Sequence, residues 1–217
     1  MVRDAKTEAK VIALDIETFV DVPPDLLDAM AAHIRPRSNI KDIAKIEADI
    51  LGKRAALLDK AALSPLTARV VSWSICTGLG EHDTLGNVDT KPNGEGEYDL
   101  LHTLDRALAE SGCVYLATKY GRKFDLPFIA ARMALRSFAP TYPLPLGHHR
   151  THLDIHDVMP ESLGLWAVRF GMAKTASGDA VDAMVRGERF DELLDYNKRD
   201  AQITWEIGSR LLPIMKG

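Results

Sequence analysis

The stretch Val11–Phe19, with the sequence VIALDIETF, indicates how the chain begins its fold. Four apolar residues lead into Asp15, Ile16 and Glu17. The β-branched residues, the apolar character and the short length favour a strand over a helix. Alternate residues of a strand share a face. We therefore expect Asp15 and Glu17 side by side at the end of this strand, with Ile16 turned into the core.

Two adjacent carboxylates repel each other and resist burial. At a frayed strand end they would simply be solvated. However, the carboxyl end of a strand is where α/β sheets bind their ligands. Because hard cations such as Mg²⁺ prefer carboxylate oxygen, the pair Asp15 and Glu17 also fits a divalent-cation site.

The composition is that of a globular domain with an ordinary surface. The chain has 217 residues, of which 46% are hydrophobic and 27% are charged, and its formal net charge is −4. This size and apolar content predict a single domain over residues 1–217. The net negative charge argues against a protein that coats nucleic acid electrostatically, but it allows one that grips the end of a single strand.

The cysteines and the N-terminal segment predict a soluble, cytoplasmic protein. Cys76 and Cys113 lie in apolar runs, which favours buried free thiols over a disulfide, and there is no CxxC metal pair. The first ten residues, MVRDAKTEAK, lack the apolar core of a secretory signal. No apolar run approaches the ~20 residues of a membrane helix, so we expect no membrane association.

Hydrophobic periodicity predicts a mixed α/β sheet with helices on both faces. A helical insertion, at about residues 22–66, follows the first strand. The expected strands are 11–17, 68–78, 81–88, 113–118 and 152–158, and the expected helical segments are 25–63, 94–112, 124–135 and most of the chain after 161.

A second acid, Asp125, lies in the segment 119–132, KYGRKFDLPFIAAR. It stands near a predicted helix start with Pro127 in the first turn, and a capping role alone would explain it. The surroundings favour more, because aromatic and basic side chains alternate there, as in sites for single-stranded nucleic acid. The basic residues between 119 and 150 are Lys119, Arg122, Lys123, Arg132, Arg136 and Arg150, and in that segment only Asp125 opposes them.

A third acid, Asp200, follows Tyr196 by four residues in the sequence YNKRD. On the predicted C-terminal helix the two side chains share a face. Taken alone, this pair is equally typical of a surface carboxylate and a packing tyrosine.

The three patterns occur in a characteristic order, and together they resemble the DEDD, or DnaQ-like, 3′–5′ exonucleases of the ribonuclease H-like superfamily. Tyr196-x-x-x-Asp200 is similar to the tyrosine branch (DEDDy), since Asp195 stands where the histidine branch has His. The nearest resemblance is to bacterial and phage exonucleases related to the proofreading domain of family-B DNA polymerases. It covers about residues 10–212 and includes His152-Leu153-Asp154 and the stretch Gly171 to Lys174.

The resemblance implies a ribonuclease H-like fold and a two-metal mechanism. Asp15, Glu17, Asp125 and Asp200 would bind two Mg²⁺ or Mn²⁺ ions, which activate a water and stabilise the leaving 3′ oxygen. Tyr196 would orient the attacking water, since a phenol of pKa near ~10 is a poor base at neutral pH. The product would be a nucleoside 5′-monophosphate.

The resemblance also points to residues that hold the substrate. Thr18 would contact the terminal nucleotide, Phe124 would pack under the site or in the core, and Lys174 would touch a phosphate or remain solvated. Tyr120 stands where the family usually has Asn, so the contact with the substrate strand differs here. The expected substrate-binding residues are Thr18, Tyr120, Arg122, Phe124 and Lys174.

Three functions remain open on the sequence. The first is an exonuclease acting on single-stranded DNA, the second is an exoribonuclease, since nothing in the sequence reads the 2′-OH, and the third is a non-catalytic module that binds nucleic-acid ends. The chain shows no polymerase region, so proofreading would act in trans. The sequence predicts no protein partner or oligomeric state.

Three weaker features of the sequence each allow two interpretations. The basic residues of 25–63 would clamp a nucleic-acid strand or line a solvated helix. The histidines of GHHRTHLDIH would bind zinc or lie on a loop near the substrate. Asp154 would support the site by a hydrogen bond or cap the next helix.

Overall fold

A mixed five-stranded sheet forms the centre of the computed structural model, which describes residues 10–216 except 81, 92–93, 175–177 and 179. The strand order is β3-β2-β1-β4-β5. β1 pairs antiparallel with β2 and parallel with β4, β2 and β3 are antiparallel, and β4 and β5 are parallel. The bounds are β1 Val11–Val20, β2 Ala68–Cys76, β3 Thr84–Val88, β4 Tyr115–Thr118 and β5 His152–Asp154.

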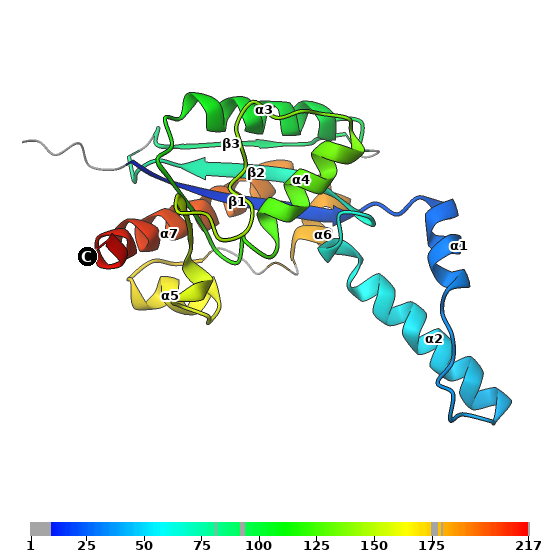
Figure 1. Cartoon of the computed structure of the whole chain (residues 1–217). Coiled ribbons are helices and arrows are strands. Elements are labelled where there is room, and N and C mark those ends of the chain that lie inside the picture. Colours follow the sequence, from blue (N-terminus) through cyan, green and yellow to red (C-terminus); the bar gives the residue numbers. More distant parts are fainter. Residues whose placement is uncertain (1–9, 81, 92–93, 175–177, 179, 217) are drawn as a thin grey trace, which may run out of the picture.

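Helices cover both faces of this sheet (Figure 1). α3 and α4 pack on one face, and α5, α6 and α7 lie on the other. This confirms the expected α/β architecture, which is compatible with a ribonuclease H-like fold. The helices are α1 Pro24–Ala32, α2 Ile43–Asp59, α3 Glu97–Glu110, α4 Asp125–Leu135, α5 Leu163–Arg169, α6 Ala180–Arg186 and α7 Phe190–Lys216, with short 3-10 turns η1 at Ala61–Leu63 and η2 at Ile155–Asp157.

The two faces of β1 explain how the acids are placed. Ile12, Leu14 and Ile16 are buried against the core that includes α3 and α4. Ala13 is buried against the core that includes α7. Asp15 and Glu17 continue the series of Ala13, because side chains of a strand alternate between faces. The prediction that Ile16 turns into the core is therefore confirmed, and the acids face α7.

The prediction that the first strand ends at its two acids is wrong. β1 continues to Val20, because β2 keeps pairing beyond Glu17, although the register shifts between Glu17 and Thr18. Glu17 pairs with Ser72 and Thr18 with Val70, so one extra residue of β2 lies opposite this point. Such a bulge increases the local twist of the strand. The acids therefore lie at an irregularity inside the strand instead of at its end.

The segment 25–63 was expected to be continuously helical, and the structure corrects this. α1 ends at Ala32 and α2 begins only at Ile43. Pro36 lies in the break, and a proline lacks the N–H that helix continuation requires. The two helices form an arm, defined here as residues 22–66, that projects from the sheet body (Figure 1).

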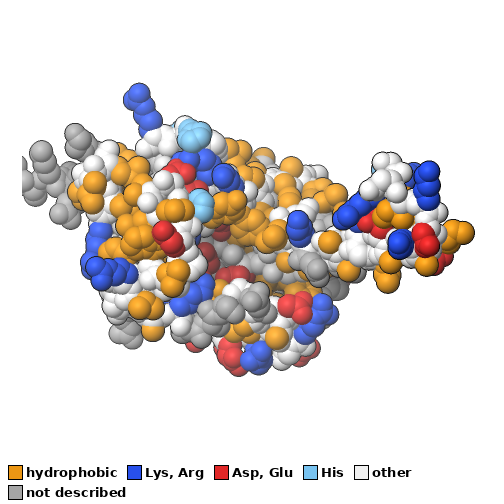
Figure 2. Space-filling model, turned by 90° about the horizontal axis from the view of Figure 1, so that it is seen from below, with side chains coloured by type: hydrophobic (Ala, Val, Ile, Leu, Met, Phe, Trp, Pro, Cys, Tyr) orange, Lys and Arg blue, Asp and Glu red, His pale blue; other side chains and the backbone are white. Residues whose placement is uncertain are grey.

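The arm carries mixed side chains instead of a continuous basic face. Lys, Arg, Asp, Glu and hydrophobic side chains alternate on the side seen from below (Figure 2). Asp49 pairs with both Arg37, at 3.3 Å, and Lys53, at 2.8 Å. Two of the basic residues considered for a clamp are therefore already paired with an acid of the same arm.

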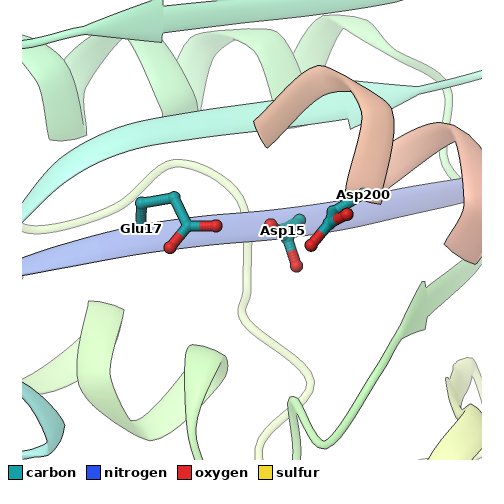
Figure 3. Close-up of side chains that lie close together, drawn as sticks. All are labelled: Asp15, Glu17 and Asp200. Atoms are coloured by element: carbon teal, nitrogen blue, oxygen red, sulfur yellow. The ribbon is translucent and has the colours of Figure 1, made fainter. Parts of the chain in front are cut away.

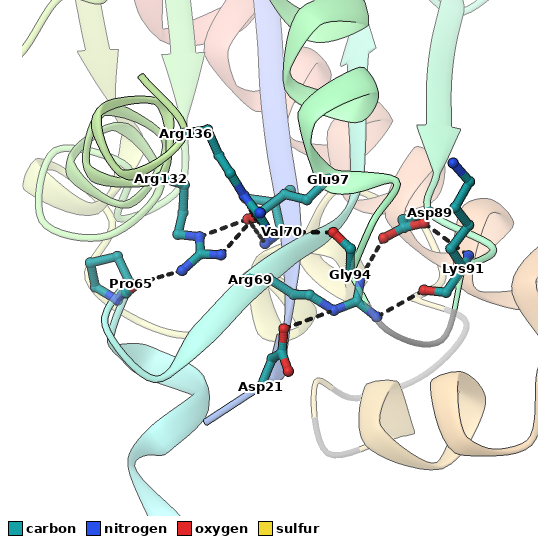
Figure 4. Close-up of polar contacts among 10 residues, drawn as sticks. All are labelled: Asp21, Pro65, Arg69, Val70, Asp89, Lys91, Gly94, Glu97, Arg132 and Arg136. Atoms are coloured by element: carbon teal, nitrogen blue, oxygen red, sulfur yellow. Dashed lines mark hydrogen bonds and ion pairs between the residues drawn. The ribbon is translucent and has the colours of Figure 1, made fainter. Parts of the chain in front are cut away.

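A buried ionic cluster fixes the base of the arm to the body (Figure 4). Glu97 is fully buried, and its carboxylate accepts hydrogen bonds from Arg132, Arg136 and the backbone N–H of Val70. Arg132 also donates to the carbonyl of Pro65, where the arm returns to the sheet. This one carboxylate therefore connects α3, α4, β2 and the base of the arm.

A second buried arginine, Arg69, connects the other end of the arm. Its guanidinium pairs with Asp89 and lies 3.7 Å from Asp21, just after β1. The backbone N–H of Asp21 donates to the carbonyl of Thr67 at 2.9 Å, so the outgoing and returning chains are bonded directly.

The Glu97 cluster shows that two of the basic residues near Asp125 in the sequence already have an acidic partner. Arg132 is buried, and both Arg132 and Arg136 pair with Glu97, which lies 35 and 39 residues away in the sequence. These two arginines stabilise the fold through their buried partner Glu97. The excess of basic residues over 119–150 is therefore smaller in three dimensions than in the sequence.

Replacing Glu97 with Ala should destabilise the protein strongly, because it leaves two arginines without their buried partner. Loss of one partner of a buried ion pair costs about 3–5 kcal/mol. The free energy of unfolding, from urea titration, is the measurement. The matched control is Glu110→Ala, since Glu110 forms an exposed pair with Arg106 at 3.7 Å and should change stability by less than about 1 kcal/mol. Equal effects of the two changes would contradict this role of Glu97.

Candidate metal centre

Three carboxylates from β1 and α7 converge on one point (Figure 3). Asp15, Glu17 and Asp200 each offer an oxygen, and these three oxygens lie within 4.8 Å of one another. Among the residues that the structure describes, this is the one group of three or more acidic, histidine or cysteine side chains with such spacing. The four histidines of 148–156 form no comparable group there.

Asp125 lies beside this group but outside it. It is the first residue of α4 and is buried. Its carboxylate accepts hydrogen bonds from its own backbone N–H and from that of Ile16, between the two acids of β1. The helix start therefore places Asp125 against the strand, as the fourth acid of the site.

Burial raises the pKa of all four acids, and repulsion by the other acids adds to the rise at Asp15 and Glu17. Burial is the main cause for Asp15 and Glu17, whose pKa values lie well above their ordinary range, and the charges of Asp200 and Asp125 add to it. Burial also raises the pKa of Asp125 to about 7. This site holds more negative charge than its own donors neutralise, and a cation would relieve that repulsion.

Asp200 has one oxygen engaged and one oxygen open. Oδ2 accepts from Lys174 Nζ at 2.5 Å, and the carboxylate also accepts the Tyr196 hydroxyl. Burial raises the pKa of Asp200, and Lys174 opposes that rise. Oδ1 is buried and has no hydrogen-bond partner among the described residues. An open, buried carboxylate oxygen in an all-oxygen group suits a hard cation such as Mg²⁺ or Mn²⁺.

Lys174 and Tyr196 form one wall of the site. The Lys174 ammonium lies 5.0 Å from the centre of the Tyr196 ring, so it contacts both the phenol and Asp200. Burial and the neighbouring carboxylates raise the pKa of the Tyr196 hydroxyl far above its ordinary value. The phenol therefore keeps its proton at any physiological pH.

Sequence reasoning missed Asn197. Its side-chain Nδ2 donates to Asp15 Oδ2 at 2.6 Å, and its Oδ1 accepts from Ser72 Oγ at 3.0 Å. The signal in the sequence was a polar residue on the buried side of an amphipathic helix, directly after Tyr196. Its partner Asp15 is 182 residues away, and no local pattern could identify that partner.

The loop before Asp125 is held by Asp154. The carboxylate of Asp154 accepts the backbone N–H groups of Tyr120, Arg122 and His156 at 2.8, 2.9 and 3.0 Å. Both interpretations of Asp154 therefore hold: it caps the turn η2, and it supports the loop that leads into α4.

Tyr120 has a backbone φ of 69°, in the left-handed region that Asn adopts more readily than Tyr. Asn, the residue usual at this position in the family that the sequence resembles, would adopt this φ with less strain. The next residue must be Gly121, because a Cβ there would come within 2.3 Å of the Thr118 hydroxyl. Tyr120 is 41% exposed, and its ring packs edge-to-face with His156, at 4.7 Å between centroids.

The other residues expected to bind substrate have partners within the protein. The Thr18 hydroxyl donates to the carbonyl of Ala62 at 2.7 Å, and Arg122 pairs with Asp157 at 2.5 Å. Phe124 packs against the core with its ring 5.4 Å from that of Phe128. Lys174 pairs with Asp200. Of the expected set, Tyr120 is the most exposed residue.

The comparisons with known proteins find matches among solved structures. No protein-family model matches the chain, and no curated protein matches it. The family B DNA polymerase from the hyperthermophilic archaeon Pyrobaculum calidifontis is similar in structure, with a TM-score of 0.63 and 15% sequence identity. The match covers 95% of this chain and 25% of the polymerase chain, so this chain spans about a quarter of that protein. At this identity the match shows the fold alone.

In the part of the chain that the structure describes, no helix is long and apolar enough to span a bilayer.

Without metal, the protein should lose stability as the pH rises from 3.8, the ordinary value of an Asp, to about 7, the pKa of Asp125. In that range the unfolded chain has released a proton that the native state still holds, so ionisation favours unfolding. Melting in EDTA over this range measures the effect. Asp125→Asn should flatten the dependence and melt higher than the wild type above pH 7.

Asp99→Asn is the matched control, because Asp99 also lies in the first turn of a helix but is exposed. This control should keep the wild-type dependence on pH. A wild-type stability that rises steadily across the same range would contradict the burial of these acids.

Proposed function

We propose that this chain is a metal-dependent 3′–5′ exonuclease of the DEDD type, tyrosine branch, which releases nucleoside 5′-monophosphates from single-stranded DNA. The observation that carries the proposal is the convergence of Asp15, Glu17 and Asp200 within 4.8 Å, with Asp125 beside them. The fold shared with a quarter of a family B DNA polymerase supports it. We treat residues 1–217 as one exonuclease domain with the arm as an insertion.

In this proposal Asp15, Glu17, Asp125 and Asp200 hold two Mg²⁺ or Mn²⁺ ions. When bound, the ions would supply positive charge that lowers the pKa of a water and stabilises the leaving 3′ oxygen. The chain's own part is to fix the oxygens. Ile16 N–H holds Asp125, Asn197 holds Asp15, and the Tyr196 hydroxyl holds Asp200.

Tyr196 acts as a positioning group and not as a base. Its hydroxyl is protonated and donates to Asp200. Its oxygen can at the same time accept a hydrogen bond from a water beside the carboxylates. The hydrogen bond would fix the direction from which this water attacks the phosphate. This is the role that we assign to Tyr196.

Two features support a nucleic-acid substrate. Tyr120, beside the loop into Asp125, offers an exposed ring, and Lys123 Nζ lies 5.5 Å from its centre. An aromatic ring next to a cation is typical of sites that hold single strands. Lys174 is the cation next to the four acids and would contact the scissile phosphate once it leaves Asp200. The likeness to a DNA polymerase favours DNA over RNA as the substrate.

The test is digestion of 5′-labelled single-stranded DNA and RNA of the same sequence, with Mg²⁺, Mn²⁺ or EDTA. We expect a ladder that shortens from the 3′ end with either metal, faster on DNA, and no shortening in EDTA. Asp200→Asn should abolish it, because this change removes a metal ligand without changing the shape of the side chain.

Asp195→Asn is the control for this variant, since Asp195 is exposed on the same helix, five residues before Asp200, and it should retain full activity. Shortening of RNA alone would identify an exoribonuclease. Retention of labelled strands in a gel without any shortening would overturn the enzyme and support a module that binds nucleic-acid ends.

Tyr196→Phe should lower kcat by about 100-fold, the cost of a misplaced reacting group, without weakening metal binding. Because the phenol stays protonated, the pH dependence of the remaining activity should match that of the wild type. Single-turnover digestion across pH, with Mn²⁺ titration beside it, is the measurement. A wild-type activity that rises with pH as a base ionises, and a variant that loses this rise, would show that Tyr196 acts as a base.

A further inference from the structure

We infer that Asn197 is a positioning residue of the metal centre: its side-chain amide holds the Asp15 carboxylate in the orientation in which it accepts a divalent cation. The inference rests on the proposed function, because it takes Asp15 to be a metal ligand. Asn197 itself touches neither the substrate nor the reacting atoms. It acts through Asp15.

The orientation of the amide follows from its two neighbours. Nδ2 lies 2.6 Å from Asp15 Oδ2, and Oδ1 lies 3.0 Å from Ser72 Oγ. Turning the amide by half a rotation would set Oδ1 against a carboxylate oxygen, which leaves two acceptors without a proton between them. Asp15 in its charged form therefore selects the orientation in which the NH₂ group donates to it. Asn197 Oδ1 then shares the proton of the Ser72 hydroxyl with the carbonyl of Asn87, which lies 3.1 Å from Ser72 Oγ.

The burial of this pair distinguishes it from an ordinary surface contact. Asn197 and Ser72 are both fully buried. A buried amide or hydroxyl without a partner costs free energy, so both side chains hold their geometry strongly. The Asp15 carboxylate is thus attached to a rigid support that spans α7 and β2.

The support is needed because Asp15 is surrounded by negative charge. Glu17, Asp200 and Asp125 all act on it, and a carboxylate free to rotate would turn away from them. A hydrogen bond on Oδ2 prevents that rotation and leaves Oδ1 for the cation. Hydrogen bonds of this kind, to the outer side of a ligand, commonly orient metal-binding groups in proteins.

Asn197 differs from Lys174 in one respect that matters for metal binding. Both donate to a proposed ligand, Asn197 to Asp15 and Lys174 to Asp200. The ammonium of Lys174 repels an arriving cation, whereas a neutral amide does not. The bond from Asn197 can therefore persist in the metal-bound state, and this allows it to act as a permanent support.

The experiment is a titration of the purified protein with Mn²⁺ alone, without nucleic acid, followed by electron paramagnetic resonance of the free ion. Asn197→Leu keeps most of the side-chain volume but removes the donor, and we expect its Mn²⁺ affinity to fall by about 10- to 100-fold. Ser72→Ala leaves the donor and removes the bond that completes its support, so we expect a smaller loss. Melting in EDTA shows whether each variant is folded.

Thr204→Val is the matched control. Thr204 is fully buried on the same helix, and its hydroxyl has no partner among the described residues. This control should bind Mn²⁺ as the wild type does. If Asn197→Leu does not fold, Ser72→Ala carries the test by itself.

The outcomes separate the inference from the proposed function. Unchanged Mn²⁺ affinity in folded Asn197→Leu, or in Ser72→Ala where Asn197→Leu does not fold, would overturn the positioning role and leave the metal centre intact. Equal losses in Asn197→Leu and Thr204→Val would also overturn it, since general damage to packing would explain both. A wild type that binds no Mn²⁺ would overturn the metal centre itself, and the role of Asn197 with it.

Discussion

Repulsion among four carboxylates is the constraint on which the rest of this structure depends. Asp15, Glu17, Asp125 and Asp200 come from one strand and two helices, and burial raises the pKa of each. A fold holds such a group together only if other interactions exceed the repulsion. Here the two apolar cores on either side of β1 supply most of that stability, and the sheet places the acids where the two cores meet.

The hydrogen-bond donors around the acids are of two kinds, neutral groups and a charged side chain. A backbone N–H and a buried amide hold Asp125 and Asp15 without any net charge. A lysine on a chain segment outside the regular elements holds Asp200 with a full charge. In the proposed metal-bound state, contacts of the first kind would remain and keep the geometry of Asp125 and Asp15. The contact from Lys174 would give way to the cation, which would neutralise Asp200 in its place.

The sequence predicted what local patterns control. Alternation in VIALDIETF placed Asp15 and Glu17 on one face and Ile16 on the other, and periodicity located α3, α4 and α7. It failed where the partner is distant in the chain. Arg132 and Arg136 looked free because Glu97 lies outside their segment, and Asn197 looked ordinary because Asp15 is 182 residues away. The end of β1 was misplaced because pairing with β2 outweighed two unfavourable acids.

The bond between Asp21 and Thr67 has a consequence for how this chain tolerates change. This hydrogen bond joins the chain that leaves the sheet for the arm to the chain that returns from it. The contacts of Arg132 with Pro65 and of Arg69 with Asp21 reinforce the same place. Closing a longer or shorter segment across a base that is already fixed alters the free energy only slightly, because the entropy of closure grows with the logarithm of length. The helices α1 and α2 are therefore an exchangeable part of the arm, whose length and surface can diverge or be redesigned while the sheet and its acids stay unchanged. The turn η1 is not exchangeable in this way, because its Ala62 carbonyl accepts the Thr18 hydroxyl of β1.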